Sequence, residues 1–269
     1  MKKVSCLLIF LFGVYSCPSA FSASSEIPPT ENLISKEYGE LLREDTKHVL
    51  SAPLGWDRRD WLFVGLGTGA VIATAAYLDE PIQKEMQGHK RRTEERLSRF
   101  FAPFGFEHQP IILGAFEAGG ILFHDDRAKQ VAHDGIASSI LATGLITGSL
   151  KMGFGRSRPF DHEGAHDFSP FSGIDSFPSG HTTQAFAVAT VISEHYDSLW
   201  IKTVSYGTAA MVGWSRMEDD THWVSDVLAG ALIGTLVAKS IVRFNRERRY
   251  QLSVTADGDK VGVKVTRNF

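Results

Sequence analysis

The amino-acid sequence predicts an all-α fold, a bundle of helices followed by a small β-hairpin. The bundle is predicted by six apolar runs, at residues 61–78, 111–123, 136–150, 182–193, 203–214 and 227–238. A membrane span needs about 20 apolar residues, whereas a run of about 10 to 14 is typical of a buried core helix. The mean hydropathy of −0.08 also argues against an integral protein with six spans. The hairpin is predicted by alternating apolar and polar residues near the end of the chain.

The first 25 residues have the features of an export signal. Two lysines precede an apolar run, and small residues follow around Ala23. We therefore assign residues 1–25 to a signal peptide and expect an exported protein, in the periplasm or on the periplasmic side of a bacterial membrane. One alternative stays open, because the residues before Cys17 are similar to a lipoprotein cleavage box, which would leave a lipid anchor on Cys17. Tyr15 is bulky for that motif, so ordinary cleavage is favoured.

Residues 26–55 are predicted to form a polar linker and an amphipathic lead-in helix. Apolar side chains recur at helical spacing from Tyr38 to Val49, and Pro53 is expected to end this helix. The next segment, 61–78, is the longest apolar run, with 18 residues and no charge, and lies at the lower length limit for a span. Both a span and a helix that rests on a membrane surface remain open for it.

The helical domain is predicted to cover residues 56–249 and the hairpin tail residues 250–269. Arginines up to Arg249 suit the C-terminal end of the last helix, where cations are favoured. Beyond it, apolar and polar residues alternate on both sides of Asp257-Gly258, which is the signal of a hairpin.

Charge and cysteine content argue against a nucleic-acid binder and against a disulfide-bonded domain. The formal net charge is −3, with 28 Lys and Arg against 31 Asp and Glu, whereas nucleic-acid binders normally carry a basic excess. An anionic substrate must therefore meet a local cluster of cations. Both cysteines, Cys6 and Cys17, lie within the predicted signal, so we expect no disulfide in the mature domain.

Three separate segments carry the groups that phosphate chemistry requires. They are Lys151-Met-Gly-Phe-Gly-Arg-Ser-Arg158-Pro159, Pro178-Ser179-Gly180-His181, and Ser215-Arg216 followed by His222 and Asp226. Lysine and arginine supply fixed positive charge, and histidine titrates near physiological pH. Together these groups indicate a doubly negative substrate and acid–base chemistry.

Pro178-Ser179-Gly180-His181 is predicted to open a helix, because the apolar run 182–193 follows it. The free backbone N–H groups of a helix N-terminus bind phosphate oxygens, and Gly180 permits a close approach. Ser179 can add a hydroxyl hydrogen bond, although a plain helix cap explains this residue equally well. Arg158 offers a planar fork to phosphate, whereas Lys151 acts as a point charge.

His222 and Asp226 are four residues apart and are predicted to share one face of a helix. Asp226 could then accept a proton from one imidazole nitrogen and leave the other aimed at a substrate, as in a catalytic triad. Taken alone, the pair would more simply be a surface pair or a pair of metal ligands. The acidic run beside Arg216, residues 218–220, is expected to be an exposed turn or to orient that arginine.

The three segments together resemble the complete signature of the type 2 phosphatidic acid phosphatase and vanadium haloperoxidase superfamily. The resemblance implies an all-helical core and a phosphohistidine mechanism that uses neither a metal nor a cofactor. On that analogy His222 attacks phosphorus, Asp226 orients it, and His181 protonates the leaving alkoxide. The phosphate oxygens would be held by Lys151, Arg158, Ser179, Gly180 and Arg216.

The expected function is therefore hydrolysis of phosphate monoesters. A phosphorylated lipid, with a lipid-linked phosphate or pyrophosphate, is the favoured substrate because of the apolar segment 61–78 and of Cys17. A soluble periplasmic acid phosphatase of broad specificity is the alternative, and the low mean hydropathy favours it. A haloperoxidase would hold vanadate in the same pocket, but the chain is short for the additional domain expected there. The segment 161–167 has the composition of a metal site, yet a solvated loop is the simpler interpretation.

Overall fold

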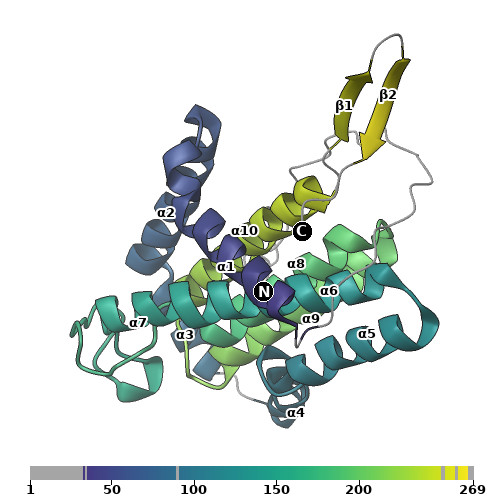
Figure 1. Ribbon diagram of the computed structural model, residues 1–269. Coiled ribbons are helices and arrows are strands. Elements are labelled where there is room, and N and C mark those ends of the chain that lie inside the picture. Colours follow the sequence, from purple (N-terminus) through teal and green to yellow (C-terminus); the bar gives the residue numbers. More distant parts are fainter. Residues whose placement is uncertain (1–32, 34, 89–90, 250–251, 258–259, 266–269) are drawn as a thin grey trace.

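The computed structural model describes residues 33, 35–88, 91–249, 252–257 and 260–265. The predicted signal peptide, the linker at 26–32 and Cys17 lie outside the described residues. The helices are α1 (Lys36–Ser51), α2 (Arg58–Tyr77), α3 (Asp79–Gly88), α4 (Arg92–Phe101), α5 (Gln109–Phe123), α6 (Asp126–Ser138), α7 (Gly148–Phe154), α8 (Gly180–His195), α9 (Leu199–Glu218) and α10 (Val224–Arg249) (Figure 1).

Shorter elements connect and follow these helices. Three 3-10 turns lie at Ala52–Gly55, Ala102–Gly105 and Pro159–Asp161, and a π-helical segment, Ser139–Thr147, joins α6 to α7. The strands β1 (Leu252–Asp257) and β2 (Lys260–Val265) pair antiparallel, with Leu252 opposite Val265. The run from α6 to α7 is therefore one long helical element that ends beyond residue 150.

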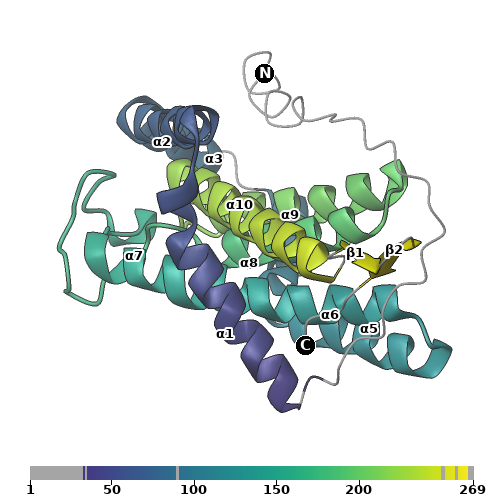
Figure 2. The same ribbon diagram turned by 45° about the horizontal axis from the view of Figure 1, so that its top comes forward.

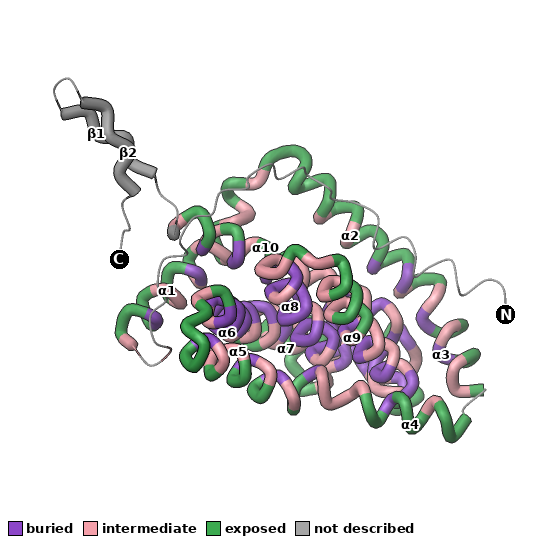
Figure 3. Tube along the Cα trace, turned by 90° about the vertical axis from the view of Figure 1, so that its right-hand side faces the viewer, coloured by how far each residue is buried: buried purple, intermediate pink, exposed green. Residues whose placement is uncertain are grey.

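The bundle is built around α8, which packs against α10, α9 and α6 (Figures 1 and 2). No charged residue occurs between Thr182 and Ser193, and most side chains of α8 are buried. A helix without a charged face is expected to be buried in this way. Figure 3 shows that the buried residues concentrate in α6, α8 and α9.

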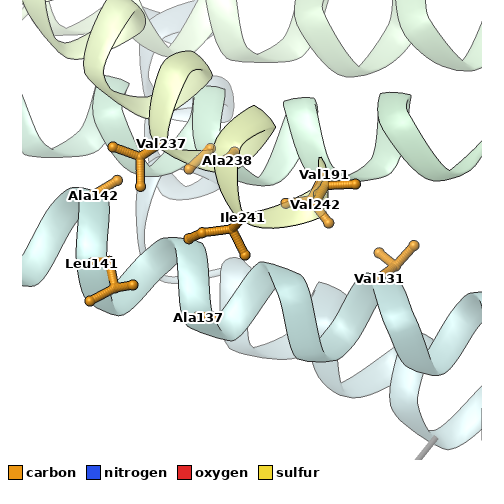
Figure 4. Close-up of a cluster of buried hydrophobic side chains, with 10 residues drawn as sticks. Val131, Ala137, Leu141, Ala142, Val191, Val237, Ala238, Ile241 and Val242 are labelled. Carbon is orange, nitrogen blue, oxygen red and sulfur yellow. The ribbon is translucent and has the colours of Figure 1, made fainter. Parts of the chain in front are cut away.

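The largest buried cluster joins α6, the π-helical segment, α8 and α10. Its members are Val131, Ala137, Leu141, Ala142, Ala187, Val191, Val237, Ala238, Ile241 and Val242 (Figure 4). Each fully buried valine, leucine or isoleucine contributes about 1.5–3 kcal/mol relative to an exposed position. This apolar layer holds the ends of the same helices in fixed relative positions.

Two glycines on α10 let its backbone approach α8 closely. A Cβ on Gly230 would lie 2.6 Å from the carbonyl oxygen of Ser179. A Cβ on Gly234 would lie 2.9 Å from the backbone nitrogen of Ala187 and would also meet the Thr183 carbonyl oxygen. Small residues at such crossings permit close helix contact. The N-terminal ends of both helices are thereby brought together.

We expect Gly234→Ala to lower the free energy of unfolding by about 1–3 kcal/mol, because the added methyl group overpacks the contact between α8 and α10. Gly207→Ala is the matched control, since nothing lies within 4 Å of a Cβ at this position on α9. The control should be neutral or stabilising by up to about 1 kcal/mol, because alanine is the better helix former. Urea unfolding measures both values. Equal effects in the two variants would contradict the close contact.

The long apolar helix α2 lies on the outside of the bundle, as its exposed residues in Figure 3 show. Asp57 caps it by accepting hydrogen bonds from the backbone N–H groups of Arg59 and Asp60. Within the described residues, α2 and α10 are the two helices long and apolar enough to cross a membrane. Their apolar windows differ in burial, at 11% for α2 and 39% for α10. Apolar side chains such as Leu66 and Ile72 are more than 60% exposed.

Helix α10 is much longer than the apolar run that predicted it, whereas α1 has the predicted end. The run 227–238 lies inside the 26-residue α10, which continues through a polar and basic segment to Arg249. The lead-in helix α1 begins at Lys36, after the capping residue Ser35, and ends just before Pro53, as expected. The hydroxyl group of Tyr38 donates to the carbonyl oxygen of His133 at 3.0 Å, which ties α1 to α6.

Candidate active site

The predicted site residues meet at one end of the bundle, around a cavity of about 330 Å³. Six of them line it, namely Lys151, Arg158, Gly180, His181, Arg216 and His222. The other two, Ser179 and Asp226, are fully buried next to this wall. Chain segments far apart in sequence therefore form one site, as the three motifs predicted.

Helix ends position these side chains. Arg216 lies in the last turn of α9, while His181 and Asp226 lie in the first turns of α8 and α10. The apolar run 136–150 predicts a helix that ends just before Lys151. In the structure, Lys151 instead lies within α7. The helix continues to Phe154 and ends at Gly155, whose φ of 56° is left-handed.

Ser179 is the N-cap of α8, as predicted. Its side-chain oxygen accepts hydrogen bonds from the backbone N–H and the hydroxyl of Thr182, at 3.5 and 3.0 Å. The first backbone N–H groups of a helix have no partner within it and favour an anion, so this end of α8 suits phosphate oxygens. Gly180 lines the cavity, and a Cβ there would make only ordinary contacts with the protein, at 3.5 Å from Phe106 and 3.8 Å from Lys151.

Acidic groups neutralise the cations of the cavity. Asp175 pairs with Arg158, whose Nη2 lies 2.7 Å from Oδ1, and with Lys151, whose Nζ lies 3.5 Å from Oδ2. Burial is the main cause that lowers the pKa of Lys151. Burial alone would raise the pKa of Asp175. The charge of Lys151 and the hydrogen bond from Arg158 outweigh burial and lower this pKa. No sequence pattern points to Asp175, because its role depends on the fold of the loop.

The acidic run beside Arg216 orients this arginine and is not simply an exposed turn. Arg216 Nη2 lies 2.6 Å from Asp219 Oδ2, and the hydroxyl of Ser98 donates to Asp219 Oδ1 at 2.6 Å. Asp219 thus links the end of α9 to α4. Arg216 is held in place before any substrate arrives.

His222 and Asp226 face each other, but the prediction that both lie on one helix is wrong. His222 lies in the turn before α10, and Asp226 is the third residue of that helix. Asp226 instead caps the helix, since its Oδ2 accepts the backbone N–H of Trp223 at 2.9 Å. The Nδ1 atom of His222 lies 3.6 Å from the same oxygen, which is longer than a hydrogen bond. Because His222 lines the cavity, its Nε2 atom is the ring nitrogen left for a substrate.

Both site histidines favour the neutral imidazole. Burial and then the charge of Arg216 lower the pKa of His181 to about 4. Burial also lowers the pKa of His222, and Asp226 opposes this shift. The His181 ring packs edge-on against Phe106, with centroids 4.9 Å apart. His222 is therefore in the form that can act as a nucleophile, whereas His181 must gain a proton.

The segment 161–167 supports the loop that carries Arg158. Asp161 Oδ2 accepts the backbone N–H of Arg158 at 2.8 Å, and Asp167 accepts a hydrogen bond from the hydroxyl of Ser157. Among the residues described here, no group of three or more His, Cys, Asp or Glu is placed to hold a metal ion.

Sequence reasoning missed Arg156, although this residue lies inside the first motif. Its side chain is 1% exposed and forms ion pairs with Asp226 and with Asp79. Ser176 also reaches Asp226, because its hydroxyl donates to Oδ2 at 2.6 Å. Spacing could not have separated the two arginines of this motif, because Arg156 and Arg158 are two residues apart and would share one side of an extended segment.

Comparison with known proteins finds matches in one group of phosphatases. The model of the PAP2 superfamily matches residues 135–250, a range that includes every predicted site residue. The chain is 38% identical over 113 residues to a lipid A 1-phosphatase of Porphyromonas gingivalis, which covers 41% of this chain and 23% of that protein. It is 34% identical over 135 residues to lipid phosphate phosphatase 1 of Arabidopsis thaliana, which covers 39% and 41%. The matched part is less than half the length of each of these relatives.

A solved structure confirms the helical fold. The crystal structure of a transmembrane PAP2 type phosphatidylglycerolphosphate phosphatase from Bacillus subtilis superposes with a TM-score of 0.52. The superposition covers 70% of this chain and 94% of that one, at 21% sequence identity. At this level of identity, the likeness concerns the fold alone.

Proposed function

We propose that this chain, which carries a PAP2 superfamily domain over residues 135–250, hydrolyses lipid-linked phosphate esters through a phosphohistidine intermediate. One observation carries the proposal. His222, with Nδ1 toward Asp226, shares a single cavity with three cations and the N-terminus of α8. A nucleophile, its orienting carboxylate and a binding site for a phosphate dianion are thus in one place.

The first step transfers the phosphoryl group to the enzyme. Nε2 of His222 attacks phosphorus, and the bond between phosphorus and the oxygen of the leaving alcohol breaks. His181 donates its proton to that oxygen, while Asp226 stabilises the positive charge that develops on His222. Lys151, Arg158 and Arg216 stabilise the equatorial oxygens, because phosphoryl transfer depends mainly on positioning and electrostatics.

The second step returns the enzyme to its starting form. His181, now neutral, accepts a proton from a water molecule that attacks phosphorus. The bond between phosphorus and Nε2 of His222 breaks, and inorganic phosphate leaves. In both steps the substrate replaces Asp175 as the anion beside Lys151 and Arg158, which the exposure of the Asp175 side chain, 47%, makes feasible.

A lipid substrate is supported by the surface next to the cations. Met152, Phe154 and Phe160 are exposed and lie within three residues of Lys151 or Arg158 in the sequence. Two further exposed residues contact them, since the centroid of the Phe168 ring lies 6.4 Å from that of Phe154 and the backbone N–H of Phe171 donates to the carbonyl oxygen of Met152. We refer to these five residues as the apolar rim. The relatives named as lipid phosphatases and the exposed apolar helix α2 point the same way. An exported enzyme on the periplasmic side of a membrane would meet such lipids, as the predicted signal peptide implies.

The second candidate is a soluble phosphatase of broad specificity, favoured by the low mean hydropathy and by the small cavity, whose lining residues are mostly polar or charged. A substrate panel separates the two. We expect the chain without residues 1–25 to prefer phosphatidate in mixed micelles over p-nitrophenyl phosphate by about 100-fold or more in kcat/KM. The reason is that the lipid would bury two or more apolar side chains of the rim. Equal values for both substrates would favour the soluble enzyme.

A variant of the apolar rim sharpens this test. Phe171→Ser, at a side chain that is 84% exposed, should lower kcat/KM for phosphatidate about tenfold and leave the soluble substrate unaffected. Leu199→Ser is the matched control, because Leu199 is 82% exposed at the opposite end of α9 from Arg216. A similar loss in both variants would contradict a lipid contact at the rim.

A further inference from the structure

A buried ion pair holds the oxygen of Asp226 that does not face His222. Arg156 Nη1 lies 2.6 Å from Asp226 Oδ1, and Arg156 Nη2 lies 2.7 Å from Asp79 Oδ2. The side chain of Arg156 is 1% exposed, and both carboxylates are fully buried. One guanidinium group is therefore shared between two acids, and Asp226 is one of them.

The guanidinium group of Arg156 is fixed on every side. Its Nε and Nη2 donate to the carbonyl oxygen of Ala165 at 2.9 and 2.6 Å. Its Nη1 also donates to the hydroxyl of Ser225 at 2.7 Å. The rings of Phe168 and Trp223 lie 5.5 Å from its Cζ atom. A planar fork with this set of partners has no freedom to rotate.

Asp79 fixes the same region from the other side. It accepts the backbone N–H of Ser225 at 2.8 Å on Oδ1 and the Ser225 hydroxyl at 2.6 Å on Oδ2. Ser225 is the second residue of α10, so the carboxylate lies at the N-terminus of this helix, where negative charge is favoured. Asp79 is also the first residue of α3 and follows α2 directly. It lies outside the range that matches the PAP2 superfamily.

We propose that Arg156 and Asp79 are positioning residues of the phosphatase reaction. Arg156 fixes the carboxylate of Asp226 so that Oδ2 faces His222, and Asp79 holds Arg156 and takes up part of its charge. Without Asp79, the arginine would form an exclusive ion pair with Asp226 and would weaken the carboxylate as a partner for the imidazolium. The proposal rests on the proposed function, because both residues act through His222.

Stability alone does not account for this arrangement. Burying two acids and an arginine costs desolvation energy, and such groups can often be replaced by apolar side chains without loss of stability. A positioning role gives a reason to keep them. It also gives the N-terminal part of the chain, outside the matched domain, a contribution to the active site.

The test compares Asp79→Asn with Asp226→Asn and with the double variant. We expect Asp79→Asn to lower kcat by about 10- to 100-fold, the usual effect of losing a group that orients a catalytic ligand. The inhibition constant of inorganic phosphate should change less than about threefold, because Lys151, Arg158 and Arg216 are untouched. In the Asp226→Asn background, the same change should lower kcat no further. Glu40→Gln, at an exposed acid of α1, is the matched control with wild-type kcat.

Each outcome has one meaning. A multiplicative loss in the double variant, or a wild-type kcat in Asp79→Asn, would overturn the positioning role. Wild-type kcat in Asp226→Asn would instead contradict the proposed function. Where Asp79→Asn does not fold, Ser225→Ala replaces it, since it removes one hydrogen bond to each member of the pair and keeps the charges. It should then lower kcat about three- to tenfold, again without effect in the Asp226→Asn background.

Discussion

Replacing His222 by alanine is expected to lower kcat by about 10⁵-fold or more, as the loss of a catalytic nucleophile does in other enzymes. The variant keeps the three cations and the N-terminus of α8, so it should still bind inorganic phosphate. Steady-state rates on p-nitrophenyl phosphate and on phosphatidate measure the effect. The loss should be similar for both substrates, because it concerns phosphorus and not the leaving group.

His166→Ala is the control for this variant, because His166 is an exposed histidine of the loop before α8. It should have wild-type kcat. The free energy of unfolding of His166→Ala should match that of the parent protein within about 1 kcal/mol, because the site is exposed. The unfolding curve of His222→Ala shows whether the variant at the buried site is still folded. A His222→Ala protein that is folded and retains near wild-type turnover would exclude His222 as the nucleophile.

His181→Gln is expected to lower kcat/KM by about 10²- to 10⁴-fold for substrates with an alkyl leaving group. The loss in kcat/KM should be much smaller for p-nitrophenyl phosphate, because this constant covers only the steps up to phosphoryl transfer and nitrophenolate leaves without a proton. The kcat value should fall for both substrates, since His181 is also the base of the second step. The ratio of the two losses in kcat/KM measures general acid catalysis, and equal losses would show that His181 does not act as the acid.

The pH dependence of the same variant tests the charge of His181. The pKa of His181 is about 4, so its protonated form in the free enzyme is lost as pH rises through this value. A bound phosphate dianion favours the imidazolium and raises the pKa. We therefore expect the alkaline limb of kcat at higher pH than that of kcat/KM. The limb of kcat should be absent in His181→Gln.

Much of the fold follows from patterns that are local in sequence. Runs such as 182–193 predict helices because their length and lack of charge suit a buried core helix. The limits of α7 and α10 were not predictable in this way, since both helices continue beyond their apolar residues. Their ends depend on caps and on tertiary contacts, such as the left-handed backbone at Gly155.

The site was predictable as a set of residues but not as a geometry. The three motifs name every group proposed for the chemistry, and the structure places six of them around one cavity. Asp175, Asp219 and Arg156 acquire their roles only from the way loops and helix ends fold together. Asp79 is the clearest example, because it lies 146 positions before Ser225, the residue that it contacts. No spacing rule connects residues so far apart.

The central claim is that a phosphoryl group is carried on His222, and rapid quenching with radiolabelled substrate tests it most directly. The account predicts that enzyme stopped during turnover carries phosphorus that is stable in alkali and labile in acid, on the peptide that contains His222. Active enzyme that turns over without any covalent phosphorus, at quench times shorter than one turnover, would contradict it.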